Sequence, residues 1–292
     1  MRKLGLVLAL LGGFLLMLGI LAKWYAPGQL MRTPLNVDTT THLDGEATIG
    51  SDPAGPVKVT SITRTNSEKS TDDTVVWVNS TCVVKDEGDV PDCVSADDPQ
   101  KRLVSASVDN FATDRKSALA VNDSKLLPPD AVPHEGIVNK WPFEAEKKTY
   151  PYWDGTLNET VDAKFIDTVD FDGLETYQYQ VKVDEAPAEV TDGIKGTYTT
   201  EKNIYVEPLT GSIVNQTENR VMKTEDGDNV VTLDIEFTDA QKKTSVEESK
   251  TNVSSLNLIR SIVPLVGFIV GIPLLLLGLF LTRRKPREKA HA

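Results

Sequence analysis

The stretch LGLVLALLGGFLLMLGILA, residues 4–22, contains no charged residue, and neither does IVPLVGFIVGIPLLLLGLFL, residues 262–281. An α-helix rises about 1.5 Å per residue, so each run is just long enough to cross a hydrocarbon core about 30 Å thick. The residues between the two runs are largely polar. We therefore expect transmembrane helices at 4–22 and 262–281, with one large domain tethered to a single membrane at both of its ends.

The charges beside the two runs predict their orientation. Arg2 and Lys3 precede the first run, and residues 282–292 after the second run form a basic tail. Lys and Arg accumulate on the cytoplasmic side of membranes, so residues 1–3 and 282–292 are predicted to be cytoplasmic and residues 23–261 extracytoplasmic. The alternative is a cleaved signal peptide at the N-terminus. The apolar run is longer than usual for a signal peptide, and no small-residue cleavage site follows it, which favours an uncleaved anchor.

Glycines recur along both apolar runs at spacings that keep them near one helix face. They are Gly5, Gly12 and Gly19 in the first run and Gly267, Gly271 and Gly278 in the second. Small residues let helix backbones approach closely in lipid, so these six positions predict helix–helix packing. The packing could occur within one chain or between chains, and the alternative is that glycine is simply common in membrane helices.

Residues 23–261 have a mainly β pattern. Several segments rich in β-branched and aromatic residues are bounded by Gly, Asp, Asn or Pro, which is typical of strands. They are 57–63, 74–78, 177–183, 196–206, 219–224 and 230–238. Residues 239–258 predict a helical stalk that leads into the second membrane helix. The expected fold class is a mainly β (β-rich α+β) extracytoplasmic domain between an N-terminal and a C-terminal transmembrane helix.

The chain has two cysteines, Cys82 and Cys93, and both lie in the predicted extracytoplasmic domain. The residues between them include Gly88 and several aspartates, which are typical of a turn. An oxidising compartment favours a disulfide that closes this loop and contributes about 2–3 kcal/mol to stability. The alternative is a free catalytic thiol, but no histidine lies close to either cysteine in the sequence.

The sequence carries no recognisable catalytic motif: neither a nucleophile elbow, nor a zinc-protease pair, nor a phosphate-binding glycine loop. We therefore expect a protein that is not an enzyme and that has no cofactor and no metal. Acidic clusters within 86–92 and 167–175 could supply oxygen ligands to Ca²⁺, but neither matches a calcium loop, which favours a solvated acidic surface. The net charge of −12 argues against nucleic acid as a partner.

Aromatic residues are densest between positions 141 and 153. Trp141, Phe143, Tyr150, Tyr152 and Trp153 lie there. In one interpretation these five side chains form an exposed rim that binds a sugar or an acyl chain, which makes them a candidate ligand-binding site. In the other they form a core plug beneath a long loop. The sequence favours the core plug slightly and leaves both interpretations open.

The segment GIVNKWPF at 136–143, followed by KKTYPYWD at 147–154, resembles the signature of the porin PorA family of actinobacterial envelope proteins. The stretches at 111–115, 173–177 and 206–211 fit the same pattern, as does the two-anchor layout. The resemblance implies a plasma-membrane protein whose main domain faces the cell wall, and no catalytic or binding residues follow from it. The layout is also similar, by topology only, to that of CD36-type receptors, which hold a β-rich lipid-binding domain between two anchors.

Three functional hypotheses follow from these observations. The first is a non-enzymatic envelope protein whose outer domain binds or conducts a lipid or another hydrophobic molecule. The second is an oligomeric porin or channel that assembles through its membrane helices, although neither helix carries a charged group to line a pore. The third is an extracytoplasmic scaffold whose acidic domain docks a basic envelope protein.

Overall fold

The computed structural model describes residues 2–191 and 193–283. The chain divides into two compact units. The first unit joins the residues up to Arg32 with those from Thr251 onward, and the second unit comprises Thr33–Lys250. The division follows the polarity of the sequence, because the first unit contains both apolar runs and the second contains the polar region between them.

The first unit is helical. Its N-terminal part consists of α1 (Arg2–Ile20), a π-helical segment η1 (Leu21–Tyr25) and the short helix α2 (Ala26–Leu30). Its C-terminal part consists of the end of α3 (Asp239–Asn257), η2 (Leu258–Ile262) and α4 (Val263–Arg283), with Pro273 inside α4. Two helices, Arg2–Leu30 and Asp239–Arg283, are long and apolar enough to cross a membrane. The predicted basic tail lies outside the described residues from position 284 onward.

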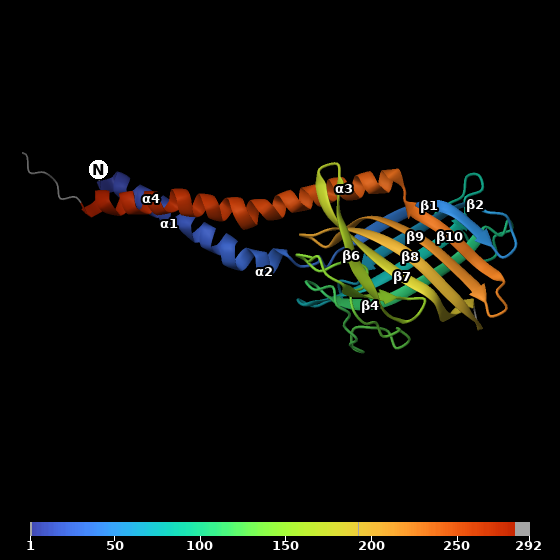
Figure 1. The fold of residues 1–292 in the computed structure, drawn as a ribbon. Helices are drawn as coiled ribbons and strands as arrows, with labels where there is room; N and C mark the ends of the chain where they lie inside the picture. The colour runs from blue at the N-terminus through green and yellow to red at the C-terminus, as the bar shows by residue number, and fades with distance from the viewer. Residues whose placement is uncertain (1, 192, 284–292) are drawn as a thin grey trace, which may run out of the picture. The chain divides into compact units, whose positions relative to one another are not determined.

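The second unit is one antiparallel sheet in which each strand pairs with its neighbours, in the order β4-β3-β2-β1-β10-β9-β8-β7-β6-β5. Figure 1 shows the sheet curling round upon itself. The strands are β1 (Asp38–Ile49), β2 (Gly55–Thr65), β3 (Thr74–Lys85), β4 (Leu103–Asp114), β5 (Tyr150–Asp154), β6 (Glu159–Phe171), β7 (Leu174–Thr191), β8 (Ile194–Glu207), β9 (Ser212–Thr224) and β10 (Asn229–Phe237). The expectation of a mainly β domain between two apolar helices is confirmed.

The long connection between β4 and β5 closes the curled sheet. Isolated bridges link Thr113 to Ala120, Leu119 to Ile137, and Ile137 to Tyr152, so that the two end strands are joined through this segment. The amide of Ile137 donates to the carbonyl of Pro151 at 2.8 Å, and the amide of Trp153 donates to the carbonyl of Ile137 at 3.0 Å. The sheet and this segment together enclose one interior.

Two glycines permit this closure. Gly136 and Gly211 both have positive φ angles, +67° and +72°, which glycine adopts at little cost. A Cβ on Gly136 would overlap the carbonyl of Pro151, and a Cβ on Gly211 would overlap the carbonyl of Trp141. The GIVNKWPF segment is therefore held against β5 and the β8–β9 turn by backbone contacts that a side chain at either position would prevent.

Apolar side chains fill most of the interior. One cluster includes Trp141, Tyr179 and Ile204, and a second includes Leu43, Val59 and Ile235. Side chains alternate between the two faces of a strand, so the intervening residues of the same strands face outward. In β8, for example, Thr200, Ile204 and Val206 are buried while Glu201 is exposed.

An ion-pair network interrupts this apolar interior. Glu218 of β9 lies opposite the core residue Ile235 and therefore points inward. Its carboxylate lies 2.6 Å from a guanidinium nitrogen of Arg220 and 3.4 Å from Nζ of Lys202. Burial alone would raise the pKa of Glu218, but Arg220 and Lys202 outweigh it and lower the pKa from 4.5 to about 2. The carboxylate is thus charged at any ordinary pH.

We predict that Glu218→Gln destabilises the second unit by about 3 kcal/mol at neutral pH, because it leaves the largely buried cations of Lys202 and Arg220 without their carboxylate partner. In the native chain the contribution is complete above pH 4.5 and is lost as the pH falls towards 2, because the folded-state pKa is the lower one. Urea unfolding followed by tryptophan fluorescence measures both effects. Glu201→Gln, on the outward face of β8, is the matched control. Equal losses for the two variants would contradict a buried network.

Candidate functional site

The structure places the five predicted aromatic residues mostly in the interior. Trp141, Tyr150 and Trp153 are buried, and Phe143 and Tyr152 are half-buried. The ring of Trp141 lies 5.0 Å from that of Tyr179 and 5.7 Å from that of Tyr152. These contacts bring Trp141, Tyr150 and Tyr152 together around Tyr179.

The other two predicted aromatic residues lie apart from that group. Trp153 packs on His134, with ring centroids 4.6 Å apart. Phe143 lies beneath Nζ of Lys140, which is 4.2 Å from the centre of its ring. The arrangement is that of a core and not of an exposed rim, because closure of the sheet turns the indole rings inward. These five rings therefore form no exposed rim, and ligand binding by them stays a prediction.

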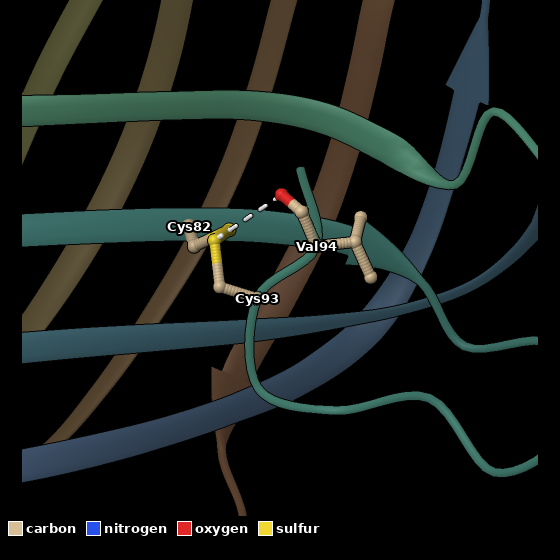
Figure 2. The surroundings of a disulfide bond; sticks show 3 residues. All are labelled: Cys82, Cys93 and Val94. Carbon is tan, nitrogen blue, oxygen red and sulfur yellow. Dashed lines mark hydrogen bonds between the residues drawn. A yellow bond between two sulfur atoms is a disulfide. The ribbon is translucent and has the colours of Figure 1, made fainter. Parts of the chain in front are cut away.

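The Cys82–Cys93 disulfide is present, as the sequence predicts. Cys82 lies in β3 and points outward, because its neighbour Val83 belongs to the interior. Figure 2 shows the bond holding the segment around Cys93 against β3. Nζ of Lys58 donates to the carbonyl of Val90 at 3.1 Å, which fixes the same loop to β2. The loop after β3 is thus fastened to the outer face of the sheet.

A shallow hollow of about 290 Å³ lies beside this loop, on the outer face of β2, β3 and β4. We call it the disulfide groove. Its walls include Ile62, Ala106 and Val108 as well as both cysteines. Val108 is 66% exposed, which is unusual for a valine in the middle of a strand. The volume is close to the lower limit for pockets that hold small molecules.

Several residues that line the disulfide groove have polar side chains, among them Ser80, Thr81 and Ser107. Thr60 lines it, and its buried hydroxyl oxygen has no hydrogen-bond partner among the described residues. Asp92 lies at the rim with its side chain 58% exposed, and one carboxylate oxygen is 3.5 Å from Nε2 of His42. The surface exposed in the groove is nonetheless largely apolar, which suits a hydrophobic molecule that also carries a polar group.

The disulfide groove was not among the sequence-predicted sites. The cysteines that border it were identified, but only as a structural bond. A second signal was present in Ala106 and Val108, which alternate with serines in β4 and so place two apolar side chains on one face of the strand. That face could be recognised as the outer one only after the partners of β4 were known.

A second hollow, of about 330 Å³, lies on β8, β9 and β10. Glu201, Asn203, Thr217 and Asp234 line it. Its chemistry is polar and acidic, so it does not suit a hydrophobic ligand. In the described ranges, no group of three or more His, Cys, Asp and Glu residues is placed to hold a metal ion.

Within the helical unit, the six predicted glycines lie where α1 meets α4, and all six are buried. A Cβ on Gly5 would lie 2.9 Å from the carbonyl oxygen of Gly278. A Cβ on Gly12 would overlap the backbone nitrogen of Leu275, and one on Gly19 would lie 3.1 Å from Cα of Gly267. The two glycine rows therefore meet each other within one chain, and many of the leucines of both helices, such as Leu10 and Leu276, are exposed.

Comparison with known proteins gives one family. The model of the family described as "Porin PorA" matches residues 4–280. A curated protein named "Porin PorA", from Corynebacterium amycolatum, is 26% identical over 174 residues, which is 42% of this chain and 45% of that protein. The match thus spans less than half of that relative's length.

Among solved structures, a LolA superfamily protein, NE2245 from Nitrosomonas europaea, aligns with 73% of this chain and 90% of its own. The TM-score is 0.16 and the sequence identity 7%. A score this low does not establish a shared fold.

We predict that Gly12→Leu separates α1 from α4, because the new side chain must occupy the place of the α4 backbone. Spin labels on Leu10 and Leu276, both lipid-exposed in the helical unit, report the distance between the helices by electron–electron resonance. The distribution of distances between the two labels should lengthen and broaden, because the axes of the two helices move apart.

Gly13→Leu is the matched control for this measurement. A Cβ at Gly13 would meet only a methyl group of Leu275, at 4.0 Å. The control should keep the native distance. Identical distributions for Gly12→Leu and Gly13→Leu would contradict close packing through the glycine rows.

Proposed function

We propose that this chain, which belongs to the porin PorA family, is a non-enzymatic envelope membrane protein whose extracytoplasmic domain holds a hydrophobic envelope molecule in the disulfide groove. The observation that carries the proposal is the groove itself, an apolar hollow of about 290 Å³ on an otherwise acidic domain. A domain tethered by two apolar helices stays within reach of the bilayer surface, so it could take such a molecule from the membrane.

The filled interior supports an outer site. Trp141, Tyr179 and the Glu218 network occupy the space enclosed by the sheet. A ligand entering there would displace well-packed side chains and separate buried ions, at a cost of several kcal/mol. The disulfide groove demands no such rearrangement, because Val108 and Ala106 are already exposed.

The disulfide supports the proposal as well. A loop fastened by Cys82–Cys93 and by the Lys58–Val90 contact forms a fixed wall. A preformed wall lowers the ordering cost of binding, so a small hollow can hold its ligand with useful affinity.

The test is native mass spectrometry of the full chain purified in mild detergent. We expect about one bound hydrophobic molecule per chain. Val108→Glu places a carboxylate in the apolar groove and should reduce the occupied fraction at least tenfold, which corresponds to about 1.4 kcal/mol. Ile166→Glu, at a 48% exposed isoleucine of β6, is the control and should retain the ligand. Equal occupancy in both variants would contradict a site at the groove.

A second candidate function is an ion or solute channel, which the family name and the name of the Corynebacterium relative favour. It requires an assembly of several chains, because two helices without charges cannot line a pore. Planar-bilayer recordings of the purified chain distinguish the two functions. Stepwise conductance that persists in Val108→Glu would support the channel, and silent bilayers would contradict it.

A further inference from the structure

Among the described residues, the curled sheet leaves several stretches of strand edge without a neighbouring strand. One is in β6 beyond the end of β5, at residues 164–171, since β5 pairs only with 159–163. This edge carries Lys164, Asp167 and Asp170 and has a shift of register between Phe165 and Asp167. Charges and bulges of this kind are the features by which proteins prevent an edge from pairing with another strand.

Another such edge belongs to β4, and it has none of these features between Ser105 and Val108. Toward its end the strand is covered, because the amide of Val121 donates to the carbonyl of Ala112 and Thr113 bridges to Ala120. Ser105, Ala106, Ser107 and Val108 are all exposed. Their register with β3 is regular, the shift in this pair of strands lying before Ser105.

We propose that this edge binds a second copy of the chain, with the two β4 strands antiparallel and the two-fold axis passing at Ser107. Each residue of one β4 strand then lies opposite the residue of the other copy for which the two residue numbers add up to 214. Ala106 faces Val108 of the second copy, and Ser105 faces Asp109. Residues whose numbers are both odd or both even share a face, so apolar residues meet apolar residues. Ser105 meets Asp109, whose carboxylate also lies 2.9 Å from Nε2 of His134 in its own chain.

The charge pattern explains why a second copy is a suitable occupant. The chain carries a net charge of −12, so its surface is generally repulsive toward itself. The uncovered β4 edge is an exception, because Asp109 is the only charged residue from Ser105 to Asn110, and in this register it does not face its own counterpart. Copies held in one membrane also meet at a raised effective concentration.

Pairing at β4 leaves the disulfide groove open. An added strand lies in the plane of the sheet, about 4.8 Å from β4, whereas the groove lies on the outer face. The second strand would therefore extend the apolar floor beside Ala106 and Val108. The dimer can form whether or not the groove holds a ligand, so the two proposals are tested separately.

The register gives a sharp test in the full chain. Ser107→Cys places two thiols opposite each other, with Cα atoms about 4.5–5.5 Å apart, within the range of a disulfide. In Ser105→Cys the two thiols lie four residues out of step, about 14 Å apart along the strands. Under mild oxidation in detergent, Ser107→Cys should form a covalent dimer and Ser105→Cys should not. Equal cross-linking of the two variants, or none in either, would overturn the proposal.

A charge exchange tests the same axis without cysteines. Ser107→Lys and Ser107→Glu each place like charges opposite each other and should each shift the mass measured by light scattering from dimer to monomer. Mixing the two variants should restore the dimer, because the opposite charges then meet. A wild-type chain that is monomeric throughout, or variants that stay monomeric when mixed, would contradict pairing of two copies through β4. The same result is expected if a different protein occupies this edge.

Discussion

The structure of the second unit depends on the closure of one antiparallel sheet by a segment that is not itself a strand. Ile137 bonds to Pro151 through its amide and to Trp153 through its carbonyl, and Trp141 bonds to Gly211, so a short irregular stretch joins the two ends of the meander. Without these contacts both faces of the sheet would be open to solvent, and the core around Trp141 and Tyr179 would have no cover. The residues that carry the family resemblance in this segment therefore have a structural explanation. Gly136 and Gly211 permit the approach, and Trp141 fills the space that closure creates.

Closure also determines where a ligand can be held. Because side chains fill the enclosed space, the chemistry available to a partner lies on the outer face and at the edges of the sheet. There the disulfide loop creates an apolar hollow on an acidic domain. The adjoining edge of β4 lacks charged residues of the kind that prevent the edge of β6 from pairing with another strand. In the helical unit the glycine rows face each other, which leaves bulky aliphatic side chains to meet lipid. In both units the internal contacts are made by glycines or by buried side chains. The side chains that stay exposed are therefore the ones that a partner can contact.

Much of the architecture could be predicted from the sequence, since it follows from local patterns. Both apolar helices, the disulfide and six strand segments are visible in composition, because β-branched residues such as those of 57–63 and 230–238 favour strands. Strand β1 was not predicted, because DTTTHLDGEATI is polar and contains Gly45, whose place is determined by close contact with Asp234 and Ile235. Strand β6 was not predicted either, because buried and exposed residues alternate only weakly along it and charged residues lie on its uncovered edge. The disulfide groove was missed for a related reason: which face of β4 is the outer one depends on strand order, which is set by contacts distant in sequence. The same dependence decides whether the aromatic side chains lie in a core or on a rim.

The measurement that tests this account most directly is photo-cross-linking of the full chain, in detergent, with a diazirine-bearing fatty acid, followed by mapping of the labelled peptides. The account predicts label on the outer-face residues of β2, β3 and β4 that border the disulfide groove, such as Ile62 and Val108. Label concentrated between Trp141 and Trp153 would contradict it, because it would mean that the aromatic cluster opens to ligand. Absence of specific label anywhere in Thr33–Lys250 would contradict a hydrophobic binding function for this domain altogether.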